Sequence, residues 1–202
     1  MGMGHHGNIT RGDVPSAEIV GVCDVDPAKL ETHEKYGYKT FTDSDKLIEW
    51  AAAGNADAIV IATPHYYHTT IAIAAIGAGL NVLTEKPLSV HKADCEKVIA
   101  AFEARPDRTK IFSEMFNQRT DKTYIKMRSM VQGGELGEFR RMNWIITNWF
   151  RTQSYVRSPN AASFIRICCC IIMSAQYDNC MAVRSTIMAA GGRPGRARAA
   201  GC

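Results

Sequence analysis

Gly2-Met3-Gly4-His5-His6-Gly7 stands at the start of the chain and has the spacing G-x-G-x-x-G. In dinucleotide-binding α/β domains the first glycine of this pattern permits a tight turn. The second lets a pyrophosphate approach the main chain, and the third lets a helix pack closely on a strand. The N-terminus of the helix that follows offers amide donors to the phosphates. The pattern therefore predicts that Gly2, Gly4 and Gly7 bind a dinucleotide cofactor.

An acidic residue follows at the distance that this pattern requires. The apolar run at residues 18–23 predicts a buried strand, and it ends at Asp24, 22 positions after Gly2. A carboxylate at this place accepts hydrogen bonds from the adenosine ribose hydroxyls and repels a 2′-phosphate. We therefore expect NAD, with NADP the less favoured cofactor. The alternative is that Asp24 serves only the turn that leads into Asp26-Pro27.

Strands and helices alternate along residues 18–105. Short runs of apolar, β-branched residues read as buried parallel strands, and the segments between them have helical patterns with caps such as Asp26-Pro27. The expected strands are residues 18–23, 58–62 and 81–84, and the expected helices are residues 27–36, 44–53, 66–77 and 90–105. This alternation predicts a doubly wound α/β domain.

The strand that should lead into the glycine pattern is missing, because only Met1 precedes Gly2. In the strand order 3-2-1-4-5-6 that strand lies in the middle of the sheet. The predicted fold class is therefore α/β, a Rossmann-type doubly wound parallel sheet without its first strand. Further on, residues 110–114 predict a strand, residues 121–133 a helix and residues 138–149 a longer strand, which indicates the beginning of a second α+β domain.

Composition narrows the class of protein. With 46% hydrophobic and 22% charged residues, the chain has the composition of a folded protein. We expect no membrane span, no secretion signal and hence a cytoplasmic location. The net charge of +4 comes from residues 151–202, which hold seven Arg and a single acidic residue. This tail lacks interleaved aromatic residues, so we expect no nucleic-acid binding. The seven Cys follow no ligand spacing, so we expect no metal site.

Three further strings carry a resemblance to one enzyme family. They are Thr63-Pro64-His65-Tyr66-Tyr67-His68, Thr84-Glu85-Lys86-Pro87-Leu88 and Gly134-Glu135-Leu136-Gly137-Glu138. Together with the glycine pattern and Asp24, they make residues 2–153 resemble the Gfo/Idh/MocA oxidoreductases, which include glucose-fructose oxidoreductase and inositol dehydrogenase. The resemblance implies an NAD(P)-binding Rossmann domain at residues 1–117 and the start of a substrate-binding sheet domain at residues 118–153.

The same resemblance assigns roles to residues that follow two of the strands. Thr63 and Pro64 are expected to line the nicotinamide side of the cofactor, with His68 nearby. Glu85 is expected to contact the nicotinamide ribose, and Pro87 to follow a cis peptide bond. For His65 and His68, a proton relay and a packing or capping role remain equal alternatives.

Lys86 is the expected catalytic residue. The resemblance places it at the substrate hydroxyl, and the chemistry supports this independently. Oxidation of a secondary alcohol removes a hydride from carbon and a proton from the hydroxyl, so the site needs a proton acceptor. A lysine at the carboxyl end of a parallel strand lies in the crevice where such folds bind ligands. The alternative is a surface lysine.

Residues 154–202 do not follow the family, and we expect them to be an aberrant, disordered tail. The family's catalytic second domain is largely absent, so activity is expected to be impaired. Two functions remain open. One is an NAD(P)-dependent oxidoreductase acting on a small-molecule sugar, polyol or cyclitol. The other is a non-catalytic dinucleotide-binding remnant or interaction fragment. A homo-oligomer is expected only in full-length members.

Overall fold

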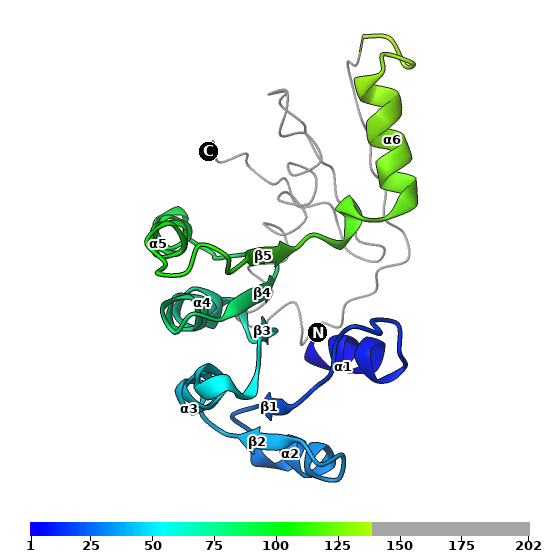
Figure 1. Cartoon of the computed structure of the whole chain (residues 1–202). Helices are drawn as coiled ribbons and strands as arrows, with labels where there is room; N and C mark the ends of the chain where they lie inside the picture. The colour runs from blue at the N-terminus through cyan, green and yellow to red at the C-terminus, as the bar shows by residue number, and fades with distance from the viewer. Residues whose placement is uncertain (139–202) are drawn as a thin grey trace, which may run out of the picture. The chain divides into compact units, whose positions relative to one another are not determined.

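The computed structural model describes residues 1–138, and helices and strands alternate along them (Figure 1). The chain divides into two compact units, Met1–Phe116 and a second one that begins at Asn117. The strands of the first unit are β1 (Gly21–Cys23), β2 (Lys39–Phe41), β3 (Ala58–Ile61), β4 (Asn81–Glu85) and β5 (Phe112–Met115). Its helices are α1 (Gly2–Thr10), α2 (Pro27–Glu34), α3 (Ser44–Trp50), η1 (Ala51–Asn55), η2 (His65–Tyr67), α4 (His68–Gly77) and α5 (Lys92–Glu103).

The second unit has two described elements, η3 (Asn117–Arg119) and α6 (Lys122–Gln132). Asp121 begins α6 by accepting hydrogen bonds from the amides of Thr123 and Tyr124. The sequence predicted this helix at residues 121–133. The strand predicted at residues 138–149 and the tail predicted at residues 154–202 lie outside the described residues, apart from residue 138 itself. Within residues 1–138, no helix is both long and apolar enough to cross a membrane.

All strand pairs among residues 1–138 are parallel, which confirms the predicted α/β class, but the sheet is in two parts. One part has the order β1-β2 and the other has the order β3-β4-β5. A doubly wound sheet places its first strand between the strands that here are β1 and β3. The sheet is therefore divided where the sequence predicts the missing strand, and within residues 1–138 no strand pairs with the outer edge of β1 or of β3.

Helix caps explain where the crossover helices begin. The Asp26 carboxylate accepts a hydrogen bond from the amide of Ala28, and Pro27 takes the first helical position, as the sequence predicted for α2. Asp43 begins α3 in the same way, by accepting from the amide of Asp45. Each cap satisfies an amide that has no partner inside its helix.

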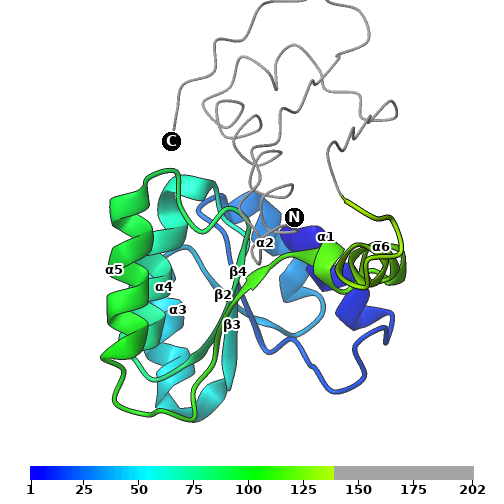
Figure 2. The same cartoon turned by 90° about the horizontal axis from the view of Figure 1, so that it is seen from above.

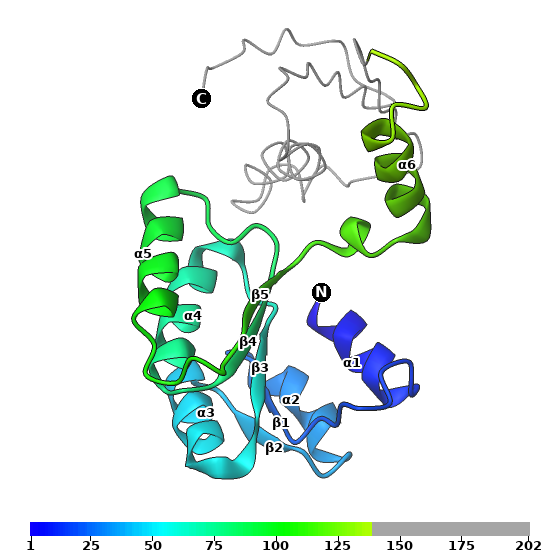
Figure 3. The same cartoon turned by 45° about the horizontal axis from the view of Figure 1, so that its top comes forward.

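The core lies between the three-stranded part of the sheet and the helices α3, α4 and α5, which share one face of it (Figure 2). Ile61, Ala72, Ala75 and Val98 are almost completely buried there. The opposite face of β3 is different, because Val60 is 43% exposed. The prediction of a buried strand is therefore correct for Ile59 and Ile61 but wrong for Val60, which α1 and α2, on the opposite side of the sheet from α3, α4 and α5 (Figure 3), do not cover.

One strand was not predicted. β2 is only three residues long, and its sequence Lys39-Thr40-Phe41 has no apolar run. It is a strand because it pairs in parallel with β1, in the register Gly21 with Lys39. A contact between distant segments, rather than local preference, determines this element.

Ile61 provides a test of the core. It is 2% exposed, so Ile61→Ala removes buried methyl groups and leaves a cavity. We expect the free energy of unfolding to fall by about 2–5 kcal/mol, measured by urea denaturation. The control is the same change at Ile99 on α5, which is 51% exposed and should stay within about 0.5 kcal/mol. Equal losses at the two positions would contradict this core.

Candidate functional site

The candidate site lies where β3 and β4 end and α1 begins. Thr63 and Pro64 follow β3, and Lys86 and Pro87 follow β4, so both loops lie at the carboxyl edge of the parallel sheet. A Cβ atom at Gly2 would lie 3.8 Å from the Cβ of Ala62. The first turn of α1 is thus in contact with the chain that leaves β3.

The three glycines are arranged differently from the sequence prediction. Gly2, Gly4 and Gly7 all lie inside α1, and none has a positive φ, so the expected tight turn is not present. A Cβ atom at Gly4 would meet nothing within 4 Å, and at Gly7 it would meet only the Arg11 side chain. The expected close approach of helix to strand is therefore wrong as well. The reason is that no strand within the described residues leads into Gly2, so nothing forces the chain to turn there.

The N-terminus of α1 nevertheless keeps donors for an anion. No side chain caps the helix. The amide of Gly4 is used, because it donates to the Met1 carbonyl at 2.7 Å. The donors of an α-helix that lack internal partners are those of its first turn, and they carry the positive end of the helix dipole. Here these are the amides of Gly2 and Met3.

A side-chain hydrogen bond joins α1 to the end of β4. The His5 Nε2 atom lies 2.8 Å from Glu85 Oε1, and Glu85 is only 3% exposed. Glu85 was expected to contact a ribose, but in this structure its carboxylate is held by His5. His5 had no assigned role, because the variable positions of the glycine pattern carry no signal for a partner 80 residues away.

His68 is fully buried at the start of α4. Its Nδ1 atom lies 2.8 Å from the Pro87 carbonyl oxygen, and its Nε2 atom lies 2.9 Å from the Thr63 carbonyl oxygen. Of the two roles left open for His68, this geometry favours packing over proton relay. The ring has no exposed atom with which to touch a cofactor, and it contacts the two loops that were expected to do so.

His65 lies next to this ring, with centroids 5.6 Å apart. Burial lowers the pKa of His65 below its ordinary value, and the neighbouring His68 and Lys86 lower it further. Its Nδ1 atom is buried and has no hydrogen-bond partner. His65 is therefore neutral at physiological pH.

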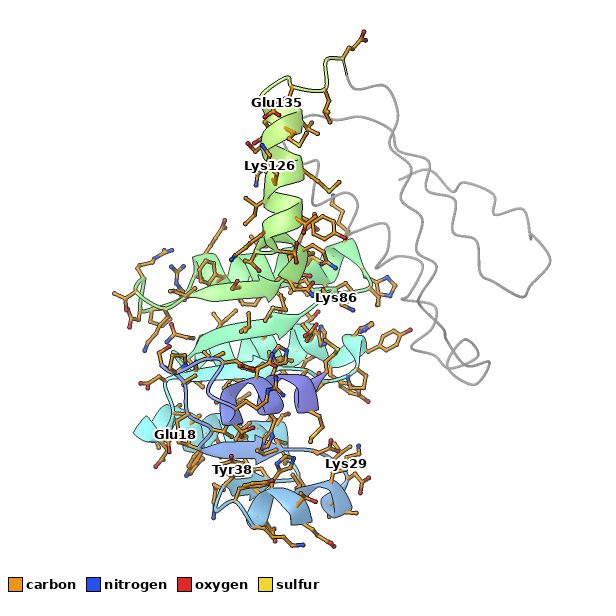
Figure 4. The ribbon with its side chains drawn as sticks, turned by 90° about the vertical axis from the view of Figure 1, so that its right-hand side faces the viewer. Glu18, Lys29, Tyr38, Lys86, Lys126 and Glu135 are labelled. Atoms are coloured by element: carbon orange, nitrogen blue, oxygen red, sulfur yellow. The ribbon has the colours of Figure 1, made fainter. Side chains whose placement is uncertain are left out.

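Lys86 lies at the same edge of the sheet. The peptide bond between Lys86 and Pro87 is cis, as the resemblance implied. Thr84 and Glu85, which end β4, are buried, so the strand that carries Lys86 is fixed up to the residue before it. In Figure 4, Lys86 and Lys29 lie on one side of the first unit and Glu18, which precedes β1, lies on the other.

Asp24 follows β1 and is partly exposed. Its carboxylate accepts a hydrogen bond from the amide of Asp26 at 2.9 Å and contacts the Lys29 ammonium at 3.2 and 3.3 Å. The turn role that the sequence left open for Asp24 is therefore present. An exposed ion pair of this kind contributes at most about 1 kcal/mol, so Lys29 leaves the carboxylate available to a ribose.

A cluster of rings holds α1 against α2 and the segment that follows it. The His6 ring meets His33, Tyr36 and Tyr38 with its edge, and the centroid distances run from 4.9 to 5.8 Å. The His6 Nε2 and His33 Nδ1 atoms are buried without a hydrogen-bond partner. This packing positions α1.

The second unit contains an open hollow of ≈ 340 Å³. Its lining includes Asn117, Gln118, Asp121 and Tyr124, and it belongs to a different unit from Lys86. Across the described part of the chain, no three His, Cys, Asp or Glu side chains are grouped so that they could hold a metal ion.

Comparison with known proteins gives a family match. A family model described as an oxidoreductase family with an NAD-binding Rossmann fold matches residues 2–112, more than half of the chain. The inositol 2-dehydrogenase of Salmonella paratyphi B is 30% identical over 128 residues, which are 62% of this chain and 37% of that protein. Inositol 2-dehydrogenase 1 of Saccharopolyspora erythraea is 31% identical over 139 residues, or 68% of this chain and 40% of that protein.

Solved structures give the same result. The myo-inositol 2-dehydrogenase of Lactobacillus plantarum is 29% identical, with a TM-score of 0.57, and the match covers 64% of this chain and 37% of that one. The WlbA dehydrogenase of Bordetella pertussis, solved with NADH and UDP-GlcNAcA, is 28% identical, with a TM-score of 0.59 over 69% of this chain and 41% of that one. The chain thus spans about two fifths of the length of these relatives.

A double-mutant cycle can measure the strength of the hydrogen bond between His5 and Glu85. His5→Ala leaves a buried carboxylate without this partner, so we expect a loss of about 1–3 kcal/mol in unfolding free energy. In a Glu85→Gln background the same change should cost measurably less, because the charge is gone. The control is Lys92→Ala, which breaks the exposed pair with Glu96 and should cost at most about 1 kcal/mol. Strict additivity of His5→Ala and Glu85→Gln would show that the two side chains do not interact.

The ring cluster makes the first unit sensitive to acid. Burial, and next the neighbouring His33, lower the pKa of His6 below 6.5. The unfolded chain therefore binds this proton more readily than the folded chain, and stability falls as the pH drops below about 6.5. His6→Phe keeps an aromatic ring that takes up no proton, so its melting temperature should fall less between about pH 7.5 and about pH 5.5. An equal fall in both proteins would exclude His6 as the responsible group.

Proposed function

The chain belongs to the Gfo/Idh/MocA oxidoreductases, whose defining domain is an NAD-binding Rossmann fold, and on this premise we propose that its first unit binds NAD(H) beside Lys86. The reaction that this site serves is hydride transfer between the nicotinamide and a hydroxyl-bearing carbon of a sugar, polyol or cyclitol. The relatives' names support this substrate class, since they include inositol dehydrogenases.

The observation that carries the proposal is the meeting of three elements at the carboxyl edge of the sheet. The uncapped N-terminus of α1, the loop after β3 and the loop after β4 lie together, and the bond from His5 to Glu85 ties the first to the third. A diphosphate fits this arrangement, because the free amides of Gly2 and Met3 point out of the positive end of the helix. The cofactor-binding residues we propose are Gly2, Gly4, Gly7, Asp24, Thr63, Pro64, His68, Glu85 and Pro87.

Some residues of this set are proposed to contact the cofactor, and others to hold the contacting residues in place. Gly2 offers an amide, Asp24 offers a carboxylate to a ribose, and Thr63 and Pro64 form the wall after β3. Glu85 and His68 are buried, so they act by holding α1 and the two loops in place. Gly4 and Gly7 serve the helix that presents the amides.

Lys86 is proposed to hold the proton that leaves the substrate hydroxyl. When bound, the nicotinamide supplies the acceptor for the hydride. The neutral form of the Lys86 amine accepts the proton from the substrate hydroxyl, and the resulting ammonium returns that proton to solvent. The cis bond to Pro87 and the buried end of β4 fix the backbone from which this side chain extends.

NAD is proposed over NADP on the basis of Asp24. A 2′-phosphate placed at this carboxylate would meet like charge, and the ribose hydroxyls of NAD would meet an acceptor. Lys29 offsets part of the repulsion, since its ammonium contacts both carboxylate oxygens. The preference therefore depends on the Asp24 side chain being free to exchange Lys29 for the ribose.

Cofactor choice tests this assignment. Asp24→Asn removes the charge but keeps the size of the side chain, so we expect NADH affinity to fall about tenfold and the ratio of NADPH to NADH affinity to rise. Fluorescence titration of the purified chain with each dinucleotide gives both values. Asp26→Asn is the matched control, because it removes the same charge two residues away and asparagine still caps α2. An unchanged ratio in Asp24→Asn would exclude Asp24 from the ribose site.

Lys86 tests the reaction itself. In an assay of NAD reduction with a panel of polyols and cyclitols, Lys86→Ala should lower turnover about 10²–10⁴-fold and leave NADH affinity within about threefold. Binding of NADH by the unaltered chain without turnover of any polyol would favour a dinucleotide-binding remnant. Absence of NADH binding would overturn the proposed function.

A further inference from the structure

The buried ring of His68 is placed between two acceptors. Its Nδ1 atom lies 2.8 Å from the Pro87 carbonyl oxygen and its Nε2 atom 2.9 Å from the Thr63 carbonyl oxygen, and the residue is 0% exposed. A carbonyl oxygen only accepts hydrogen bonds, so each contact needs an N–H on the ring. A neutral imidazole has one N–H, whereas an imidazolium has two.

No other state of the ring satisfies both contacts. A neutral His68 would turn a nitrogen lone pair toward a carbonyl lone pair at hydrogen-bond distance, with no water to separate them. Flipping the ring would replace both nitrogens by carbon atoms. Hydrogen bonds from a charged donor are about twice as strong as neutral ones, and here the charge is shared over two of them.

Nearby groups indicate whether His65 or His68 carries the positive charge. The start of α4, Lys86 and His65 all oppose a second positive charge. Of the two histidines, His65 has its Nδ1 atom buried without a partner, and burial lowers its pKa, so His65 is the neutral one. His68 has acceptors at both nitrogens and is the ring that keeps the proton.

The two carbonyls belong to loops that the sheet does not hold together. The ladder between β3 and β4 ends with the pair of Ile61 and Thr84. Thr63 and Pro87 lie beyond that pair, so His68 provides a connection where the strands provide none. The connection is made by one rigid ring.

We propose that His68 is a doubly protonated positioning residue that clamps the loop after β3 to the loop after β4. The clamp itself rests on hydrogen-bond geometry alone. Its effect on cofactor binding rests on the proposed function, because Thr63, Pro64 and Lys86 are the residues whose loops it fixes.

The first test measures the ring directly in the unaltered chain. Nitrogen-15 NMR of the histidine side chains, with His68 assigned by comparison with His68→Gln, separates an N–H nitrogen from one with a free lone pair. We expect two N–H nitrogens on His68 at neutral pH and one on His65. A lone-pair nitrogen on His68 would overturn the clamp, whatever the protein binds.

The second test measures the consequence. Glutamine donates from one nitrogen only, so His68→Gln keeps one loop contact and loses the other. We expect its NADH affinity to fall about tenfold and amide hydrogen exchange in both loops to rise. His91→Gln is the control, because His91 is exposed and precedes α5. Unchanged affinity and exchange in a folded His68→Gln would also overturn the clamp.

The two arms separate this inference from the proposed function. If the unaltered chain binds no NADH, the proposed function fails, and the ring nitrogens still decide the state of His68. If His68→Gln does not fold, His68 is assigned in the unaltered chain through its bonds to its own backbone, and that measurement remains decisive.

Discussion

The parallel ladder of β3 and β4 stops at Ile61 and Thr84, and the candidate site depends on how the chain is held beyond that pair. Past a strand end the backbone has no ladder partner, and Thr63, Pro64, Lys86 and Pro87, which belong to the expected site, all lie there. Three hydrogen bonds made by two histidines hold this region. His68 bonds the backbone of both loops, and His5 bonds Glu85 from the first helix. The positions of the two loops and of α1 therefore depend on the hydrogen bonds of His68, His5 and Glu85.

These contacts link parts of the chain that are distant in sequence. His5 comes from α1, Glu85 ends β4, Pro87 follows β4, and His68 begins α4. α1 in turn packs against α2 through the contact between the His6 and His33 rings. The hydrophobic core fixes the sheet against α3, α4 and α5, and the polar contacts transmit that order to the loops. A change in one histidine thus affects groups on two other elements.

Local sequence signals were enough for most of the fold. Caps such as Asp26 and short apolar runs such as residues 58–61 report on their own neighbourhood, so the helices and the longer strands were predicted with ends shifted by a few residues. β2 was not predicted because it is a strand through its pairing with β1, and its own residues give no strand signal. The glycine pattern predicted a turn, but a turn needs a strand on each side. With none leading into Gly2 among the described residues, the same glycines continue as helix.

The sequence predicted where the site residues lie, but not which of them bond to one another. The resemblance placed Glu85, Lys86, Pro87 and Thr63 at one edge of the sheet, and the cis bond before Pro87 was confirmed. It did not indicate that His5 bonds to Glu85, or that His68 bonds to the backbone of both loops. That information depends on packing between α1, α4 and the strand ends, and no single segment of sequence contains it.

The division of the sheet also has a consequence for the pairing of its edges. Along residues 1–138, β1 and β3 each present a row of amide and carbonyl groups that no neighbouring strand takes up, and the side chains of β3 are apolar. Such a row is a template on which another extended segment can pair. A further strand lying between β1 and β3 would take up both rows and join the two parts into one sheet.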